Sequence, residues 1–335
     1  MGSTRTRRAA LGILAGTVAG LRVAPAKAAD TLRVGKAVAQ NFGYTPLDIG
    51  MAKGIFKRHD IEITILDFTG GAKIAQAMAA GSVDISLSAG PDMQFVAKGA
   101  PEIAVASITE SPVFMGLCIG KDSPIHTIDD LKGKVVATNG IGTGLDIALR
   151  WVLSKHHLEA KTDYTDVEVN FPNMKSALAE HKVDLISAVL PFMYDPELVK
   201  IGRTLFEQGT ETGPSELLMW AARAPYIQEN RAALVDLMED VLRMQRWYFD
   251  PANHVEAQQI AAKITHQPIE SLNWVFTKGD FYRSPNGNPD LKTVADDLKM
   301  EKTLGFLKTD IDVPKYADLS IVDEASTRLG KLKEE

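Results

Sequence analysis

The sequence contains one internal repeat, with a spacing of 100 residues. Residues 77–85 (AMAAGSVDI) match residues 177–185 (ALAEHKVDL), and Pro91 and Pro191 continue the same register. This spacing is too long for the unit of a solenoid, so the pattern predicts two similar lobes rather than a stacked array. Chance similarity between two strand–helix segments is the alternative interpretation.

Apolar segments of strand length alternate with helical segments in both halves. The first half predicts strands at residues 32–38, 61–68, 83–87 and 103–107, with helices at 46–59, 72–81 and 91–99. The second predicts strands at 135–138, 167–171 and 183–188, with helices at 143–156 and 174–180. Strands separated by helices form βαβ units with parallel strands, so we expect an α/β fold of two Rossmann-like lobes.

Residues 225–335 show helical periodicity with almost no strand signal. Helices are expected at 231–249, 251–265 and 291–306, with a loop at 284–289. We expect these helices to pack on the first lobe, which then comprises residues 29–115 and 222–335, while residues 116–221 form the second lobe. Crossovers are expected at 113–121 and 216–223, and two crossovers form a hinge around a central ligand cleft.

The first 28 residues have the composition of an export signal. Arg5, Arg7 and Arg8 precede an apolar run at 9–21, and residues 26–28 (AKA) form a cleavage site of the A-x-A type. Residues 6–11 (TRRAAL) also resemble a twin-arginine motif, so two export routes remain open. We therefore expect a periplasmic protein, cleaved near Ala28 and without stable insertion in a membrane.

Removal of this segment makes the chain more acidic. The whole chain has a formal net charge of −6, and the first 28 residues hold five basic and no acidic residues, so the remainder carries −11. This balance argues against a nucleic-acid partner, which needs a clustered basic surface. Cys118 is the single cysteine, and its apolar surroundings favour a buried thiol over a reactive one.

The motifs of common enzymes are absent or incomplete. Residues 140–145 (GIGTGL) follow a predicted strand, but Leu145 stands where the dinucleotide-binding fingerprint requires glycine. The seven histidines form no pair at metal-ligand spacing, and no nucleophile-elbow or zinc-protease motif occurs. We expect no catalytic residue, no metal and no cofactor.

Glycine, proline and small polar residues follow the predicted strands, where the next helices begin. They occur at residues 41–46, 69–71 and 88–91 in the first half, and at 139–143, 171–173 and 190–192 in the second. Open α/β sheets bind ligands at these strand ends, where helix starts present unpaired N–H groups to anions. Lys73 and Lys175 are the nearby cations, and an ordinary role in turns is the alternative for each loop.

The chain resembles the periplasmic solute-binding proteins of ABC importers, specifically the nitrate/sulfonate/taurine type. The resemblance rests on residues 43–47 (GYTPL), 52–56 (AKGIF), 68–71 (FTGG), 80–84 (AGSVD) and 128–134 (IDDLKGK). It covers residues 31–220 and implies a type II periplasmic binding protein fold that holds one ligand without catalysis. It also implies ligand contacts at Asn41, Phe42, Tyr44, Thr69, Ser88 and Ala89 in the first lobe, and at Asn139, Gly142, Thr143, Leu190 and Pro191 in the second.

These observations lead to a hypothesis about the solute. We expect the aromatic side chains of Phe42, Tyr44, Phe171 and Phe192 to cover an apolar body, and the amides of residues 69–70 (including Gly70) and 142–143 to hold an acidic head. A sulfonate or an aromatic carboxylate fits better than nitrate, which needs no apolar wall. The protein would deliver this small anion, as a monomer, to an ABC permease and its ATPase.

Two alternatives remain open. An enzyme on the same two lobes, such as a synthase of the pyrimidine precursor of thiamine, would turn its ligand over. A ligand sensor would need an output module, for which the sequence shows no signal.

Overall fold

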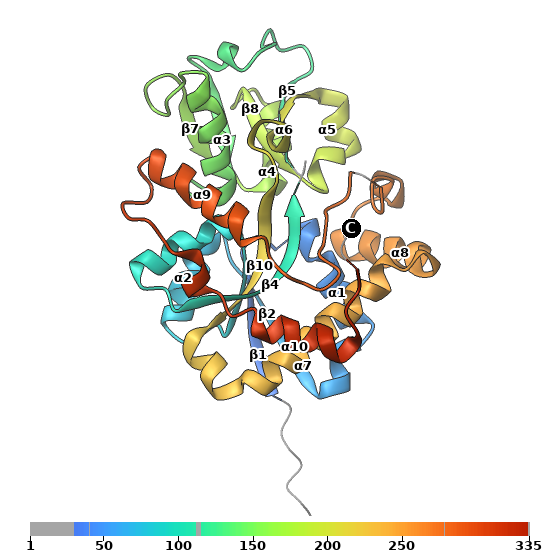
Figure 1. The fold of residues 1–335 in the computed structure, drawn as a ribbon. Coiled ribbons are helices and arrows are strands. Elements are labelled where there is room, and N and C mark those ends of the chain that lie inside the picture. The colour runs from blue at the N-terminus through green and yellow to red at the C-terminus, as the bar shows by residue number, and fades with distance from the viewer. Residues whose placement is uncertain (1–29, 40, 112–114, 278, 334–335) are drawn as a thin grey trace, which may run out of the picture.

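The structure is a computed structural model that describes residues 30–39, 41–111, 115–277 and 279–333. Two five-stranded sheets form two α/β lobes, one above the other in Figure 1. This confirms the two-lobed α/β fold that the repeat predicts. The expected export signal lies outside the described residues. Within the described part of the chain, no helix is both long and apolar enough to cross a membrane.

The first sheet has the strand order β2-β1-β3-β10-β4. Its strands are β1 (Asp30–Lys36), β2 (Ile61–Asp67), β3 (Ile85–Ser88), β4 (Glu102–Ser111) and β10 (Ser215–Arg223). β1 runs parallel to β2 and β3, whereas β10 lies antiparallel between β3 and β4. Its helices are α1 (Thr45–Ala52), α2 (Gly71–Ala79) and the 3-10 helices η1 (Phe42–Tyr44), η2 (Ile55–His59) and η3 (Gly90–Lys98). The helix predicted at 46–59 is therefore divided, because Gly54 adopts a left-handed conformation with φ of 70°.

The second sheet has the order β7-β6-β8-β5-β9, which repeats the parallel and antiparallel pairing of the first. Its strands are β5 (Met115–Gly120), β6 (Val135–Thr138), β7 (Thr165–Glu168), β8 (Leu185–Val189) and β9 (Gly202–Glu207). Its helices are α3 (Gly144–Lys155), α4 (Phe171–Ala179), α5 (Pro196–Ile201), α6 (Gln208–Thr212), η4 (Asp129–Leu131) and η5 (Phe192–Tyr194). The strand predicted at 167–171 ends at Glu168, because Phe171 and Pro172 already begin α4.

The repeated aspartates Asp84 and Asp184 have the same role in the two lobes. Asp84 Oδ2 accepts a hydrogen bond from the backbone amide of Arg33 at 3.2 Å, and Asp184 Oδ2 accepts one from Val135 at 2.8 Å. Each aspartate thereby ties the strand it precedes to the first parallel strand of its own sheet. The sequence repeat therefore corresponds to a structural repeat.

The crossings between the sheets differ in one place from the prediction. The first crossing follows β4 and precedes β5, and residues 112–114 lie outside the described residues. The segment predicted as the second crossing, residues 216–223, is instead most of β10, which pairs with β3 and β4 over its length. The chain returns to the first sheet between Glu207 and Ser215, because β10 extends the first sheet rather than joining the two.

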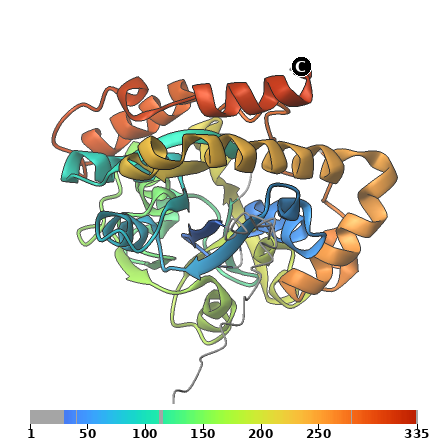
Figure 2. The ribbon, with the colours of Figure 1, turned by 90° about the horizontal axis from the view of Figure 1, so that it is seen from below.

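The C-terminal part is helical, as predicted. It contains α7 (Ala224–Phe249), α8 (His254–Thr265), α9 (Leu291–Thr303), α10 (Ser320–Leu329), η6 (Pro251–Asn253), η7 (Ile269–Leu272) and η8 (Val313–Tyr316). Figure 2 shows the long helix α7 crossing the first lobe, with the red C-terminal helices beside it. Asn230 interrupts the helical backbone of α7 with φ of −133°, close to the predicted helix start at residue 231.

The segment after α9 also reaches the second lobe. The guanidinium carbon of Arg150, on α3, lies 5.5 Å from the ring centre of Phe306. A Cβ at Gly142 would lie 3.6 Å from the same ring. The C-terminal helices thus pack on the first lobe, and this part of the chain also touches the second lobe through Phe306, through α9 beside α3, and through Trp274, which stacks on Tyr194. Cys118, on β5, is buried as expected, and burial raises the pKa of its thiol to about 11.

Candidate functional site

Two cavities adjoin each other between the lobes, at the carboxyl ends of the parallel strands. An apolar cavity of about 240 Å³ is lined by Ala37, Val38, Ala39, Phe68, Thr69, Asn139, Asn170, Phe171, Pro172 and Phe192. A polar cavity of about 470 Å³ is lined by Thr69, Gly70, Ala72, Lys73, Asp92, Phe95, Asn139, Gly140, Ile141, Gly142, Thr143, Glu168 and Asn170. Both include Thr69, Asn139 and Asn170, so one ligand can extend from the first cavity into the second.

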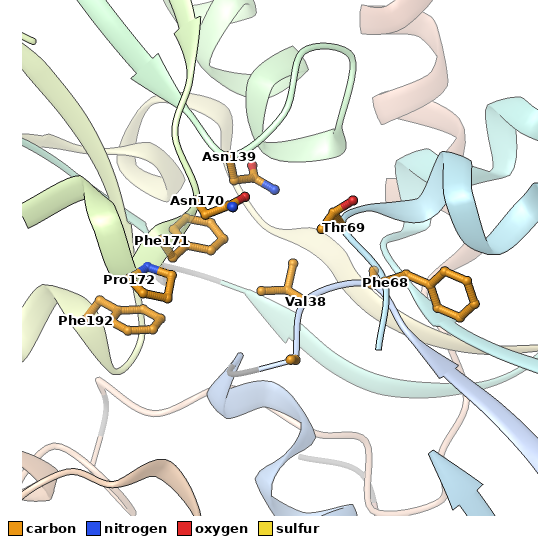
Figure 3. A pocket seen from close by; sticks show the side chains of 10 residues that line it. Val38, Phe68, Thr69, Asn139, Asn170, Phe171, Pro172 and Phe192 are labelled. Atoms are coloured by element: carbon orange, nitrogen blue, oxygen red, sulfur yellow. The ribbon is translucent and has the colours of Figure 1, made fainter. Parts of the chain in front are cut away.

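Aromatic rings form one wall of the apolar cavity. The rings of Phe171 and Phe192 are stacked, with centres 6.1 Å apart and planes 15° apart. Figure 3 shows these two rings with Pro172 on the side of the second lobe and Val38 on the side of the first. Phe68 packs over Gly35, where a Cβ would lie 3.1 Å from its ring. This half of the site can hold an apolar or aromatic body.

Two asparagines mark the boundary between the cavities. Figure 3 shows Asn139 and Asn170 on the side of the second lobe, with Thr69 opposite. Thr143 Oγ1 lies 3.2 Å from Asn139 Oδ1 and 2.8 Å from the carbonyl oxygen of Gly140, so it can donate to either. Among the described residues, the Asn170 side chain has no hydrogen-bond partner. Amide groups placed in this way offer both donors and acceptors to a ligand.

The loop amides expected to hold an acidic head are occupied by the protein itself. The amide of Gly142 donates to Asp146 Oδ2 at 2.8 Å, and that of Thr143 donates to the carbonyl oxygen of Gly140 at 3.3 Å. The amide of Gly70 donates to the carbonyl oxygen of Ala37 at 2.8 Å. These contacts leave the amides of Gly70, Gly142 and Thr143 without a free N–H for a ligand, so an anion site on the four amides stays a prediction. Sequence reasoning missed that the carboxylate of Asp146, four residues after Gly142, turns back to the loop.

Asp92 is a buried carboxylate at the polar cavity, on the first turn of η3. Only 4% of the residue is exposed, and its Oδ2 accepts a hydrogen bond from the amide of Ala89 at 3.0 Å. Its Oδ1 has no hydrogen-bond partner among the described residues. Burial raises the pKa of Asp92 to about 6, against the lowering effect of the Ala89 amide. Lys73 and Glu168 are exposed members of the same cavity.

The predicted ligand residues divide into three groups. Seven of them line one or both cavities, namely Thr69, Gly70, Asn139, Gly142, Thr143, Phe171 and Phe192. Ala89 lines a separate crevice of about 20 Å³, beside Pro91 and Gly144.

The remaining predicted residues are held in protein contacts outside both cavities. Asn41 caps the amide of Gly43, Phe42 packs edge-on against Trp274 with ring centres 4.6 Å apart, and Ser88 Oγ lies 3.2 Å from Ser86 Oγ. The Tyr44 hydroxyl donates to the carbonyl oxygen of Leu87 at 2.7 Å. The Leu190 carbonyl accepts from Phe42, and the Pro191 carbonyl accepts from Tyr194. These residues were expected at the ligand because they follow the strands, but their side chains turn into the lobes.

Val38, Phe68, Asp92 and Asn170 are cavity residues that the sequence prediction did not include. Asn170 could have been found, because an asparagine directly before a Phe-Pro helix start has the position of an N-cap. The sequence pattern places Asp92 in the first turn of a helix, where an aspartate is common, and nothing in the sequence indicates that one of its oxygens lacks a hydrogen-bond partner. The described residues contain no group of three or more His, Cys, Asp or Glu side chains that could hold a metal ion.

The chain matches one protein family over most of both sheets. A family profile described as NMT1/THI5 like matches residues 41–215, which is more than half of the chain. Over 206 residues the chain is 25% identical to a protein of Escherichia coli (strain K12) named for binding aliphatic sulfonates, covering 58% of this chain and 62% of that protein. Over 143 residues it is 30% identical to a 4-amino-5-hydroxymethyl-2-methylpyrimidine phosphate synthase of Saccharomyces cerevisiae, covering 42% of this chain and 41% of the synthase. The chain thus spans less than two thirds of either relative.

Solved structures share the fold across most of the chain. The periplasmic aliphatic sulphonate binding protein SsuA from Escherichia coli superposes with a TM-score of 0.67 at 18% identity, covering 85% of this chain and 91% of that one. The periplasmic nitrate-binding protein NrtA from Synechocystis PCC 6803 superposes with a TM-score of 0.71 at 18% identity, covering 90% and 89%. At this identity the likeness establishes the fold, which is that of periplasmic binding proteins.

Proposed function

The chain belongs to the NMT1/THI5-like family, and from this premise we propose that it is the periplasmic solute-binding component of an ABC importer. It would take up a small organic solute between its lobes and deliver it to the permease and its ATPase. The fold shared with a sulphonate-binding and a nitrate-binding protein supports this proposal. An export signal in residues 1–28 is part of the same proposal.

The observation that carries the proposal is the two-part cavity between the lobes. Its apolar part is walled by the stacked rings of Phe171 and Phe192, and its polar part begins at Asn139 and Asn170. A molecule with an apolar body and one polar end fits this arrangement, whereas a bare inorganic ion would leave the phenylalanine wall without a partner. The phenylalanine wall thus supports the apolar body that the sequence leads us to expect in the solute.

The test is binding of small aromatic and aliphatic compounds, measured by thermal shift and isothermal titration calorimetry. We expect Phe192→Ala to weaken binding of the best compound by about tenfold or more, because it removes half of the stacked wall. Val199→Ala, an exposed position of the same lobe, serves as the control and should leave affinity unchanged. Equal affinity of the Phe192 variant and wild type would contradict the assignment of the site.

A second candidate function is enzymatic, since a relative that is 30% identical is named a pyrimidine phosphate synthase. Incubation followed by mass spectrometry separates the two functions. Recovery of the bound compound unchanged supports a binding protein, whereas formation of a product would establish an enzyme.

A further inference from the structure

The polar cavity contains one buried charge whose hydrogen bonding is incomplete. Asp92 is almost fully buried, and its Oδ1 lacks a donor among the described residues, whereas its Oδ2 accepts a hydrogen bond from the amide of Ala89. A buried carboxylate oxygen without a donor is unfavourable, because the protein does not replace the water that it loses. Such a group at the wall of a ligand cavity is a natural acceptor for a donor on the ligand.

The position of Asp92 also works against an anion in this cavity. A Cβ on Gly71 would lie 2.2 Å from the carboxylate carbon of Asp92, so the carboxylate lies directly against the first residue of α2. The start of a helix is otherwise a favourable place for an oxyanion, but a second negative group would here meet Asp92 at short range. In the opposite lobe, the amide of Gly142 is engaged by Asp146.

The charged residues at the rim of the cavity do not reverse this preference against an anion. Lys73 and Glu168 are both exposed, and Glu168 Oε1 already accepts a hydrogen bond from the amide of Ile141 at 2.8 Å. Exposed charges are screened by water and salt, so the buried carboxylate dominates the interaction with a group deep in the cavity.

We propose, building on the solute-binding function proposed above, that the solute carries a positively charged N–H group, an ammonium or an amidinium, which donates to Asp92. The apolar body of the same molecule lies against Phe171 and Phe192. The continuity of the two cavities through Thr69, Asn139 and Asn170 allows one molecule to make both contacts. The solute is therefore a cation or a zwitterion, and not the simple anion that the sequence suggests.

The experiment uses the full chain and five probes that share one ring. Benzylamine and benzamidine carry the cationic group, benzyl alcohol is neutral, and benzoate and benzenesulfonate are anions. We expect the two cations to bind at least tenfold more tightly than the other three, because a charge-assisted hydrogen bond is stronger than a neutral one.

Two variants test the role of Asp92 itself. Asp92→Asn keeps an oxygen that can accept from Ala89 and removes the charge, so the preference for cations should disappear while binding of benzyl alcohol changes less than threefold. Gly71→Ala should displace the carboxylate by steric contact and weaken cation binding as well. Glu159→Gln is the control, because it removes an exposed carboxylate of the second lobe that lines neither cavity, and it should change affinity less than threefold.

The outcomes separate this inference from the proposed function. Tightest binding of benzoate or benzenesulfonate, with no loss in Asp92→Asn, would overturn the cationic group and leave the solute-binding function intact. A cation preference that survives Asp92→Asn would likewise overturn it. If none of the five probes binds at a concentration of about 10 mM, the aromatic cavity is not a binding site, and both proposals fail.

Discussion

The backbone amide of Phe42 in the first lobe donates a hydrogen bond to the carbonyl oxygen of Leu190 in the second lobe, at 3.3 Å. Both residues were expected to touch the ligand, and they touch each other instead. The Gln94 side chain also donates across the lobes, to the carbonyl oxygen of Gly142 at 3.4 Å. The lobes are thus joined by polar contacts that a ligand does not have to supply.

The contact between Phe306 and Arg150 should stabilise this arrangement of the lobes. We expect Phe306→Ala to favour separation of the lobes, because it removes a partly buried cation–π contact, which contributes about 1 kcal/mol. Small-angle scattering should then report a larger radius of gyration. Val255→Ala, an exposed position on α8, is the control. An unchanged radius for the Phe306 variant would show that this contact does not hold the lobes together.

Tyr44 should matter for stability and not for affinity. Tyr44→Phe removes the hydrogen bond to the carbonyl oxygen of Leu87, so we expect a loss of about 1 kcal/mol in the free energy of unfolding. The residue lies outside both cavities, and the affinity for the best compound should stay within twofold. Urea unfolding and calorimetry measure the two effects. A large loss of affinity with unchanged stability would instead show that Tyr44 contacts the ligand.

Glu301 should make the protein less stable as the pH rises. The residue is fully buried, and burial, with smaller effects of Asp92 and Asp297, raises its pKa from 4.5 to about 9. Above pH 4.5 the unfolded chain releases this proton while the folded protein keeps it, so stability falls between pH 4.5 and 9.

Glu301→Gln should therefore flatten the fall in stability, measured by urea unfolding at several pH values across this range. The fall should persist in part, because burial also raises the pKa of Glu216 to about 8 and of Asp297 to about 7. Glu62→Gln changes an exposed carboxylate and provides the control. The same slope in wild type and Glu301→Gln would show that Glu301 is not protonated in the folded state.

His181 occupies a position that the first lobe fills with glycine. Its φ is 54°, and Gly81 at the equivalent place in the repeat has φ of 70°. Left-handed backbone costs a side-chain-bearing residue about 1 kcal/mol, so His181→Gly should stabilise the protein by up to about that amount. Gly81→Ala should destabilise it by a similar amount. Thermal unfolding of the two variants gives the comparison, and equal shifts of the same sign would contradict this reasoning.

The fold could be predicted from the sequence because its signals are local and occur twice. The Val-Asp pairs at residues 83–84 and 183–184 directly precede β3 and β8 in equivalent places, and apolar segments alternate with helix starts in both halves. The assignment of β10 failed because it depends on pairing with β4, from which it is separated by more than 100 residues. Such pairing leaves no pattern within the strand itself.

The site could be predicted only to the level of its loops. Strand ends and glycines indicate where a cavity forms, and Thr69, Asn139 and Phe192 do line it. Which side chains turn inward depends on tertiary contacts, as in Tyr44, whose hydroxyl bonds to Leu87 inside the first lobe. The partners of Gly142 and Asp92 depend in the same way on groups that approach in space, and these decide the charge that the cavity favours.

The place of β10 in the first sheet also sets an order in which the two lobes can be completed. The second lobe takes its five strands from one continuous stretch of chain, Met115 to Glu207. In the first sheet, β10 is the strand that joins β4 to β3. As the chain leaves the ribosome from its N-terminus, β4 therefore has no strand to pair with until the whole second lobe has followed it. The second lobe can finish folding first, and the sheet of the first lobe is completed only afterwards.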